Sequence, residues 1–271
     1  MTQYADIRND WKKLLPFVAG ILLCAAAVSI ILASTLLSKD YVDKTFEEKR
    51  VYSGITDSVR DKAKNAYLKT DPPQKVKNDL TTIMAEVITE EPVKKEVRDI
   101  LNQLYSGKKA RVKGKYLQES ISSNAKSYNS RKSLGMDASK LDEFIGKSVD
   151  AGKETIDVSK YTDKIPVSLS GGTVKAAIFT FLALAALMLN YFMSYDRLAK
   201  TGIALIVGGG LLLLVGIVFG GAFKVDEMSF PLEAMKDAAE ELKSAVTSRC
   251  LIFGLLFSAA GGGSIIYKRM K

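Results

Sequence analysis

The chain has 271 residues, of which 47% are hydrophobic and 25% charged, with two cysteines and no histidine. The lack of histidine excludes histidine-based catalysis and histidine-ligated metal, and two cysteines cannot build a four-thiolate zinc site or a disulfide framework. We therefore expect neither a metal nor a cofactor. The formal net charge of +9 would be typical of nucleic-acid binding, but the apolar residues are segregated into blocks, which indicates a membrane protein.

Four stretches contain no charged residue, namely 14–38, 176–195, 201–223 and 250–267. A hydrocarbon core about 30 Å thick needs about 20 helical residues, so each stretch is long enough to cross it, the last only just. Buried helices of a soluble protein are usually shorter and amphipathic. The first stretch is also longer than the roughly 7 to 15 apolar residues of a signal peptide, which favours a retained signal anchor.

Basic residues in the short segments predict the orientation in the membrane. Residues 1–13, 196–200 and 268–271 together carry eight Lys or Arg, whereas residues 224–249 carry four against six acids. The positive-inside rule then places the first three segments and both termini in the cytoplasm of a cell-membrane protein, and residues 39–175 and 224–249 outside. The predicted fold is all-α, with four transmembrane helices and an extracytoplasmic helical domain between the first two.

The long outer segment shows helical spacing of apolar residues and helix-stop signals, which predict a small helical bundle with its own core. The predicted helices span 40–67, 74–87, 90–106, 116–134 and 137–156. In the first, apolar residues recur every four positions, with one step of five. The loop 224–249 adds an amphipathic outer helix, entered at Phe230 and Pro231, which either docks on the larger domain or lies on the membrane surface.

The densest run of positive charge lies just beyond Gly107. Its five basic residues are Lys108, Lys109, Arg111, Lys113 and Lys115. One interpretation is an anionic partner outside the membrane, either lipid headgroups or an anionic surface polymer such as a phosphate-rich wall polymer. The simpler interpretation is a solvated loop between two helices. Nucleic acid is not expected, because the run lies outside the cell and has no interleaved aromatic platform.

Small residues recur four apart in the last two predicted spans: Gly216 and Gly220 in one, and Gly254, Ser258 and Gly262 in the other. Such faces let helix backbones approach closely, so the two spans could pack together as a hairpin or associate with a second copy as a homo-oligomer. The run Gly208 to Gly210 predicts a local bend. Asn190 is the strongest polar group in the spans and is interpreted as an interhelical contact.

Two stretches carry a resemblance to a known group of proteins. They are Tyr41 to Phe46, just outside the first predicted span, and Val87 to Val97. With the short basic start and the long helical outer segment, they resemble uncharacterised multi-pass membrane proteins of Gram-positive bacteria with a helical outer domain after the first span. The resemblance covers roughly the first 110 residues and implies no activity.

The sequence favours a non-enzymatic function. The four spans contain no Asp, Glu, Lys or Arg, which argues against a pump or coupled transporter. No nucleophile elbow or phosphate-binding loop occurs, and the adjacent acid pairs do not face each other on a helix. We expect a membrane protein whose outer domain binds, senses or scaffolds at the cell surface, with membrane lipids and other envelope membrane proteins as partners. The alternative is a transport subunit similar to four-span ABC permeases, which the short link 196–200 disfavours.

Overall fold

A computed structural model describes residues 2–70, 72–132, 134, 136–157, 171–193 and 196–271. Every regular element in these residues is a helix. Residues 158–170 of the predicted outer domain and 194–195 of the second predicted span lie outside the described residues. The chain divides into two compact units, one formed by 1–42, 171–229 and 239–271 and the other by 43–170 and 230–238.

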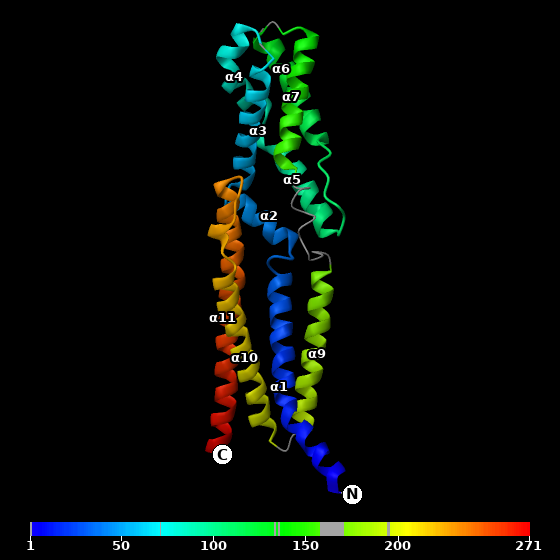
Figure 1. The fold of residues 1–271 in the computed structure, drawn as a ribbon, viewed down its shortest axis with the longest axis vertical. Coiled ribbons are helices and arrows are strands. Elements are labelled where there is room, and N and C mark those ends of the chain that lie inside the picture. Colours follow the sequence, from blue (N-terminus) through cyan, green and yellow to red (C-terminus); the bar gives the residue numbers. More distant parts are fainter. Residues whose placement is uncertain (1, 71, 133, 135, 158–170, 194–195) are drawn as a thin grey trace. The chain divides into compact units, whose positions relative to one another are not determined.

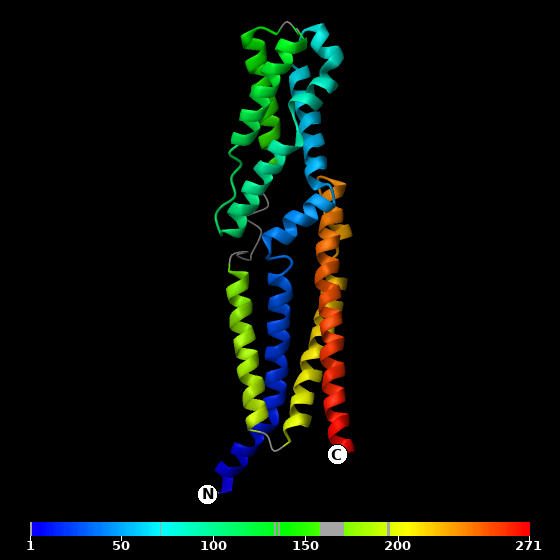
Figure 2. The same cartoon turned by 180° about the vertical axis from the view of Figure 1, so that it is seen from behind.

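The first unit is built from long apolar helices. They are α1 (Thr2–Ala33), α9 (Gly172–Phe192), α10 (Arg197–Ala222) and the larger part of α11 (Glu233–Met270), with a short 3₁₀ turn, η1 (Val225–Glu227), after α10. These four helices are long and apolar enough to cross a membrane. Figures 1 and 2 show α1 lying beside both α9 and α10. We call this unit the membrane unit.

Large apolar side chains point outward from the membrane unit. Phe181 on α9, Ile217 on α10 and Leu255 on α11 are 73%, 62% and 61% exposed. Burial of apolar surface stabilises a protein in water by about 25 cal/mol per Å², so leaving such side chains in water would forgo that stabilisation, whereas hydrocarbon solvates them well. The exposed apolar faces are therefore typical of helices that contact lipid.

Helix ends in this unit differ from the predicted limits of the spans. The first helix ends at Ala33, turns at 34–37 precede the next helix, and α9 begins at Gly172. The amphipathic loop helix and the fourth span, predicted as separate segments, form the single helix α11. No glycine or proline occurs between residues 232 and 253, so nothing in the backbone chemistry ends a helix where the sequence changes from amphipathic to apolar.

The second unit, which we call the helical domain, is a bundle of shorter helices. It contains the end of α2 (Lys39–Glu48), α3 (Val51–Leu68), α4 (Gln74–Val87), α5 (Glu90–Tyr105), α6 (Lys115–Lys132), α7 (Ala138–Ile156) and the first residues of α11. Helix α3 packs along α7, and α6 packs against α4, α5 and α7.

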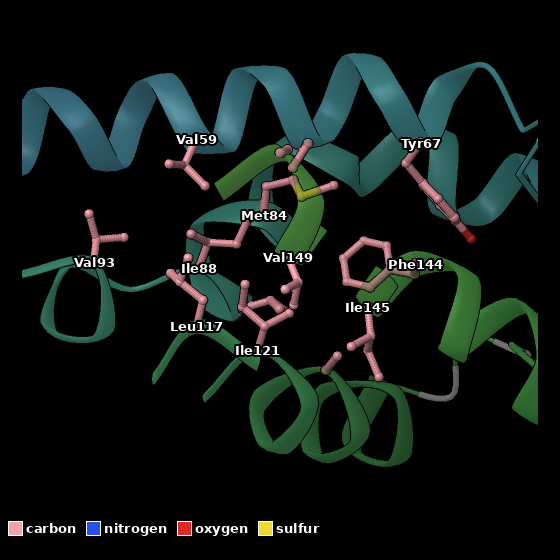
Figure 3. Close-up of a cluster of buried hydrophobic side chains, with 14 of the residues drawn as sticks. Val59, Tyr67, Met84, Ile88, Val93, Leu117, Ile121, Phe144, Ile145 and Val149 are labelled. Carbon is pink, nitrogen blue, oxygen red and sulfur yellow. The ribbon is translucent and has the colours of Figure 1, made fainter. Parts of the chain in front are cut away.

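A continuous apolar core fills the helical domain (Figure 3). The rings of Tyr67 on α3 and Phe144 on α7 meet edge to face with centroids 5.0 Å apart, and Leu117 and Ile121 of α6 are fully buried. Full burial of such a side chain contributes about 1.5–3 kcal/mol to the stability of the folded protein. Because the apolar faces of five helices converge on this one cluster, the domain has a core independent of the membrane unit.

One predicted helix of this domain was wrong. The expected single helix from Asp40 to Tyr67 is broken into α2 and α3 at Arg50, which has a left-handed backbone with φ 56°. The break coincides with the only five-residue step in the apolar spacing, between Phe46 and Val51. An extra residue in the repeat rotates the apolar stripe by about 100°, and the turn at Arg50 lets Phe46 of α2 and Val51 of α3 contact the same core.

The beginning of the loop helix docks on the domain core. Ala238 is buried, and Leu232, Ala234 and Met235 pack against the same cluster. A methyl group added at Gly54 of α3 would lie 3.7 Å from both Ala234 Cβ and Leu232 Cδ1. The sequence left open whether this segment docks on the larger domain or lies on the membrane surface. The structure shows that its first residues dock on the domain.

Candidate functional site

The basic segment, residues 108–115, links α5 to α6 in the helical domain. It is bounded by Gly107 and Gly114, both with φ 70°, a left-handed conformation that glycine adopts without a steric penalty. A side chain at Gly114 would also collide with Lys153 of α7. The two glycines therefore set where the segment leaves α5 and where it enters α6.

The backbone of the segment is fixed to α5. The amide of Gln103 pairs with the backbone of Arg111, accepting its N–H at 2.9 Å and donating to its carbonyl at 3.1 Å. The N–H of Gly114 donates to Glu96 Oε1 at 2.6 Å, and Glu96 itself is buried. Since Ala110 is buried as well, the segment is an ordered strap whose backbone is held in place at three points.

The charged side chains of the strap point away from this anchoring. Lys108, Lys109 and Arg111 are exposed, and within the described residues Lys108 and Arg111 form no side-chain ion pair or hydrogen bond. Lys113 Nζ lies 3.3 Å from Asp99, and Lys115 Nζ lies 3.9 Å from Glu119, with both lysines mostly exposed. The strap thus presents fixed positive charge to solvent.

Two of these lysines share a surface cavity of about 590 Å³. One face of α6 forms most of the wall, because its lining residues recur at helical spacing. The lining residues are Lys113, Lys115, Gln118, Glu119, Ser122, Ser123 and Lys126. Three ammonium groups face one carboxylate, so the cavity has a net positive charge. The structure brings Lys113 and Lys115 together here, while Lys108, Lys109 and Arg111 lie outside this lining.

A second polar feature, which the sequence analysis missed, joins α2, α3 and α5. We call it the polar clamp, formed by Asp43, Glu47, Tyr52, Lys94 and Arg98. Arg98 donates through Nε to both carboxylate oxygens of Asp43 at 2.9 and 3.1 Å, Tyr52 donates its hydroxyl to the same carboxylate, and Lys94 Nζ lies 2.5 Å from Glu47. Acids at 43 and 47 and bases at 94 and 98 are both spaced i, i+4, which is the signal that could have revealed it.

The polar clamp shifts the pKa values of Asp43, Tyr52 and Arg98, and that of Arg98 is raised through its hydrogen bond to Asp43. Burial acts to raise the pKa of Asp43, but hydrogen bonds from Arg98 and Tyr52, with the charges of Arg98 and Lys94, outweigh it and hold that pKa below its usual value. Burial and the bond to Asp43 raise the pKa of Tyr52. The clamp therefore keeps its carboxylate ionised and its phenol neutral at ordinary pH.

Small residues line the contact between α10 and α11. A methyl group added at Gly216 would lie 3.1 Å from Cys250 Cβ, one at Gly220 would lie 3.2 Å from Thr247, and one at Gly254 would lie 2.9 Å from the carbonyl oxygen of Gly209. Ser258 also faces Gly209. Around Gly262, in contrast, no heavy atom of a neighbouring described residue lies within 4 Å.

The run Gly208 to Gly210, expected to bend its helix, lies inside the continuous helix α10. A methyl group at Gly208 would lie 2.9 Å from the carbonyl oxygen of Gly20 in α1, and one at Gly209 would lie 2.6 Å from the carbonyl oxygen of Gly254 in α11. Around Gly210, no described neighbour lies within that 4 Å range. Successive residues are about 100° apart on a helix, so adjacent glycines contact different helices.

Asn190 of α9 is fully buried, and neither atom of its amide hydrogen-bonds to a described residue. The expected interhelical hydrogen bond is therefore not formed with those residues.

The described residues also contain no group of three or more Cys, Asp or Glu side chains placed to hold a metal ion. Comparison with protein-family models, curated proteins and solved structures gave no match.

Proposed function

We propose that this protein is a non-enzymatic, multi-pass protein of the cell membrane whose helical domain lies outside the cytoplasm and binds an anionic component of the cell surface. The observation that carries the proposal is the strap: its backbone is hydrogen-bonded to Gln103 and Glu96, while all five of its basic side chains are exposed. Like charges held close together repel one another, and an anionic ligand relieves that repulsion. An ordered, exposed basic strap is thus better explained by a ligand than by solvation alone.

The charge distribution of the chain supports the proposed orientation. Eight basic residues lie in 1–13, 196–200 and 268–271, and α9 and α10 are joined by a link from Met193 to Asp196 only. Such short basic segments remain in the cytoplasm. The brevity of the link between α9 and α10 leaves no coupling element there to engage a cytoplasmic ATPase, so it supports binding over transport.

Labelling of single cysteines tests the orientation. With Cys24 and Cys250 replaced by alanine, a membrane-impermeant maleimide should label Lys147→Cys on intact cells and should label Lys271→Cys only after permeabilisation. Both positions are exposed, so accessibility of the side chain does not limit either reaction. The opposite pattern would place the helical domain in the cytoplasm and remove the proposal.

Charge replacement tests the binding. Changing Lys108, Lys109, Arg111, Lys113 and Lys115 to glutamine should abolish salt-sensitive association of the purified protein with cell-surface material, because exposed charges act through a screened field. The matched control changes five other exposed lysines of the domain to glutamine: Lys62, Lys69, Lys75, Lys140 and Lys147. Equal loss in both variants would show dependence on net charge rather than on the strap. Co-purification of an ATPase from native membranes would instead favour the transport subunit.

A further inference from the structure

We propose that the cavity on α6 is a binding site for a phosphodiester flanked by hydroxyl groups, the repeating unit of a polyol-phosphate chain. This inference rests on the proposed function and deepens it, because it selects one place on the basic surface and one ligand chemistry. The site consists of Lys113, Lys115 and Lys126 with the polar side chains of Gln118, Ser122 and Ser123.

The charge of the cavity suits one phosphodiester. Lys113 and Lys115 are partly neutralised by Asp99 and Glu119, whereas the exposed Lys126 side chain forms no ion pair within the described residues. Three ammonium groups against these two carboxylates leave one formal positive charge for an anionic oxygen. Hydrogen bonds between ammonium groups and phosphate oxygens are charge-assisted and are among the strongest polar contacts in proteins.

The uncharged part of the lining suits hydroxyl groups. Ser122, Ser123 and Gln118 direct polar groups to the same cavity, and within the described part of the chain their side chains form no hydrogen bond. Serine hydroxyls and glutamine amides both donate and accept, as polyol hydroxyls do. The wall runs along α6 from Lys115 to Lys126.

The backbone that carries the cavity lysines is held in place before a ligand binds. Glu96 holds the N–H of Gly114, the residue between Lys113 and Lys115, and Gln103 holds Arg111. Lys115, Ser122 and Lys126 then follow along one helix, α6. A preformed site loses less conformational entropy on binding. A bilayer surface, in contrast, would engage the exposed lysines of the strap whether or not they line the cavity.

The test compares two triple variants of the full chain in detergent. Lys113→Gln, Lys115→Gln and Lys126→Gln remove three charges from the cavity, while Lys108→Gln, Lys109→Gln and Arg111→Gln remove the same charge from outside it. The probe is a glycerol 3-phosphate oligomer, measured by calorimetry beside polyaspartate and inorganic phosphate. We expect the cavity triple to weaken oligomer binding about tenfold or more and the outer triple to change it about threefold or less.

A double variant, Ser122→Ala with Ser123→Ala, alters no charge. It should weaken binding of the glycerol phosphate oligomer and leave binding of inorganic phosphate unchanged.

The cavity assignment would be overturned by equal losses in the two triples, by equally tight binding of polyaspartate, or by no binding of the oligomer to the native protein. The assignment would also be overturned, in favour of a membrane surface, if the protein bound vesicles containing phosphatidylglycerol more tightly than the glycerol phosphate oligomer and both triples lost that binding equally. In those cases the proposed function stands if the five-residue replacement still loses cell-surface association. Thermal unfolding confirms that each variant is folded.

Discussion

The buried carboxylate of Glu96 accepts the N–H of Gly114 at 2.6 Å, so a residue in the middle of α5 determines where the basic strap ends and α6 begins. The second carboxylate oxygen of Glu96 has no hydrogen-bond partner among the described residues. The one hydrogen bond that this buried acid forms with those residues is therefore to the backbone of the strap, and that contact places the lysines on either side of Gly114.

Replacing Glu96 with alanine should free the end of the strap. We expect faster hydrogen exchange at the Gly114 amide and a stability lower by about 1.5–3 kcal/mol, because a buried hydrogen bond to a charged group is lost. Glu96→Gln keeps an acceptor at the Oε1 position and should retain most of the protection. Hydrogen exchange with mass spectrometry measures the protection of Gly114 in both variants. Equal exchange in the alanine and glutamine variants would contradict the role of Glu96 as the acceptor that holds the strap.

Two neighbouring glycines of α10 should respond differently to the same substitution. Gly209→Ala places a methyl group 2.5 Å from Ser258 Oγ and 2.6 Å from a backbone carbonyl of α11, which should lower the thermal stability in detergent by about 1–3 kcal/mol through overpacking. Gly210→Ala is the matched control, because no neighbouring described atom lies near its added methyl group. If both variants melt like the native protein, the α10–α11 contact is not formed as described.

The core of the helical domain should depend strongly on Phe144. Truncation to alanine removes its edge-to-face contact with Tyr67 and leaves a cavity, with an expected loss of about 3–5 kcal/mol. Leu68→Ala, at an apolar position of α3 that is 40% exposed, should cost far less. Hydrogen exchange of peptides from α3 and α7 reports the difference, and comparable protection in the two variants would argue against a shared core.

Acid should weaken the polar clamp. The pKa of Asp43 is lower in the folded protein than its ordinary value, so its contribution to stability is present above the unfolded pKa and is lost as the pH falls through the folded pKa, in a window below about pH 4. Asp43→Asn removes this titration. Unfolding measured from pH 6 down to pH 2 should therefore show a shallower pH dependence for Asp43→Asn than for the native protein, and parallel curves would exclude a linked carboxylate.

Local signals in the sequence predicted many helix limits of the helical domain. Helix α4 begins at Gln74 and ends at Val87, as expected, and α5 begins directly after Thr89 with Pro92 in its first turn, although the Thr89 side chain makes no capping hydrogen bond to a described residue. Caps, prolines and apolar periodicity act within one or two turns. For this reason they can be recognised in the sequence without knowledge of the tertiary structure.

Features that depend on distant contacts were harder to predict. The ordering of the strap depends on Gln103 and Glu96, which are ordinary polar residues of an amphipathic helix until Arg111 and Gly114 fold against them. Lys126 was not grouped with the basic run, because it lies eleven positions after Lys115, and the turns of α6 bring the two lysines to one face. The roles of Gly208 and Gly209 likewise depend on which helix faces each one.

The glycine contacts of α10 have a consequence for how the protein is made. The nascent chain completes α10 before α11 exists, so the peptide groups around Gly209 that α11 later covers would first meet acyl chains or the insertion machinery. Bilayer hydrocarbon solvates peptide groups poorly. In a product that terminates after Phe223, the peptide groups around Gly209 would stay uncovered permanently. We expect cells to degrade such a product faster than the complete protein.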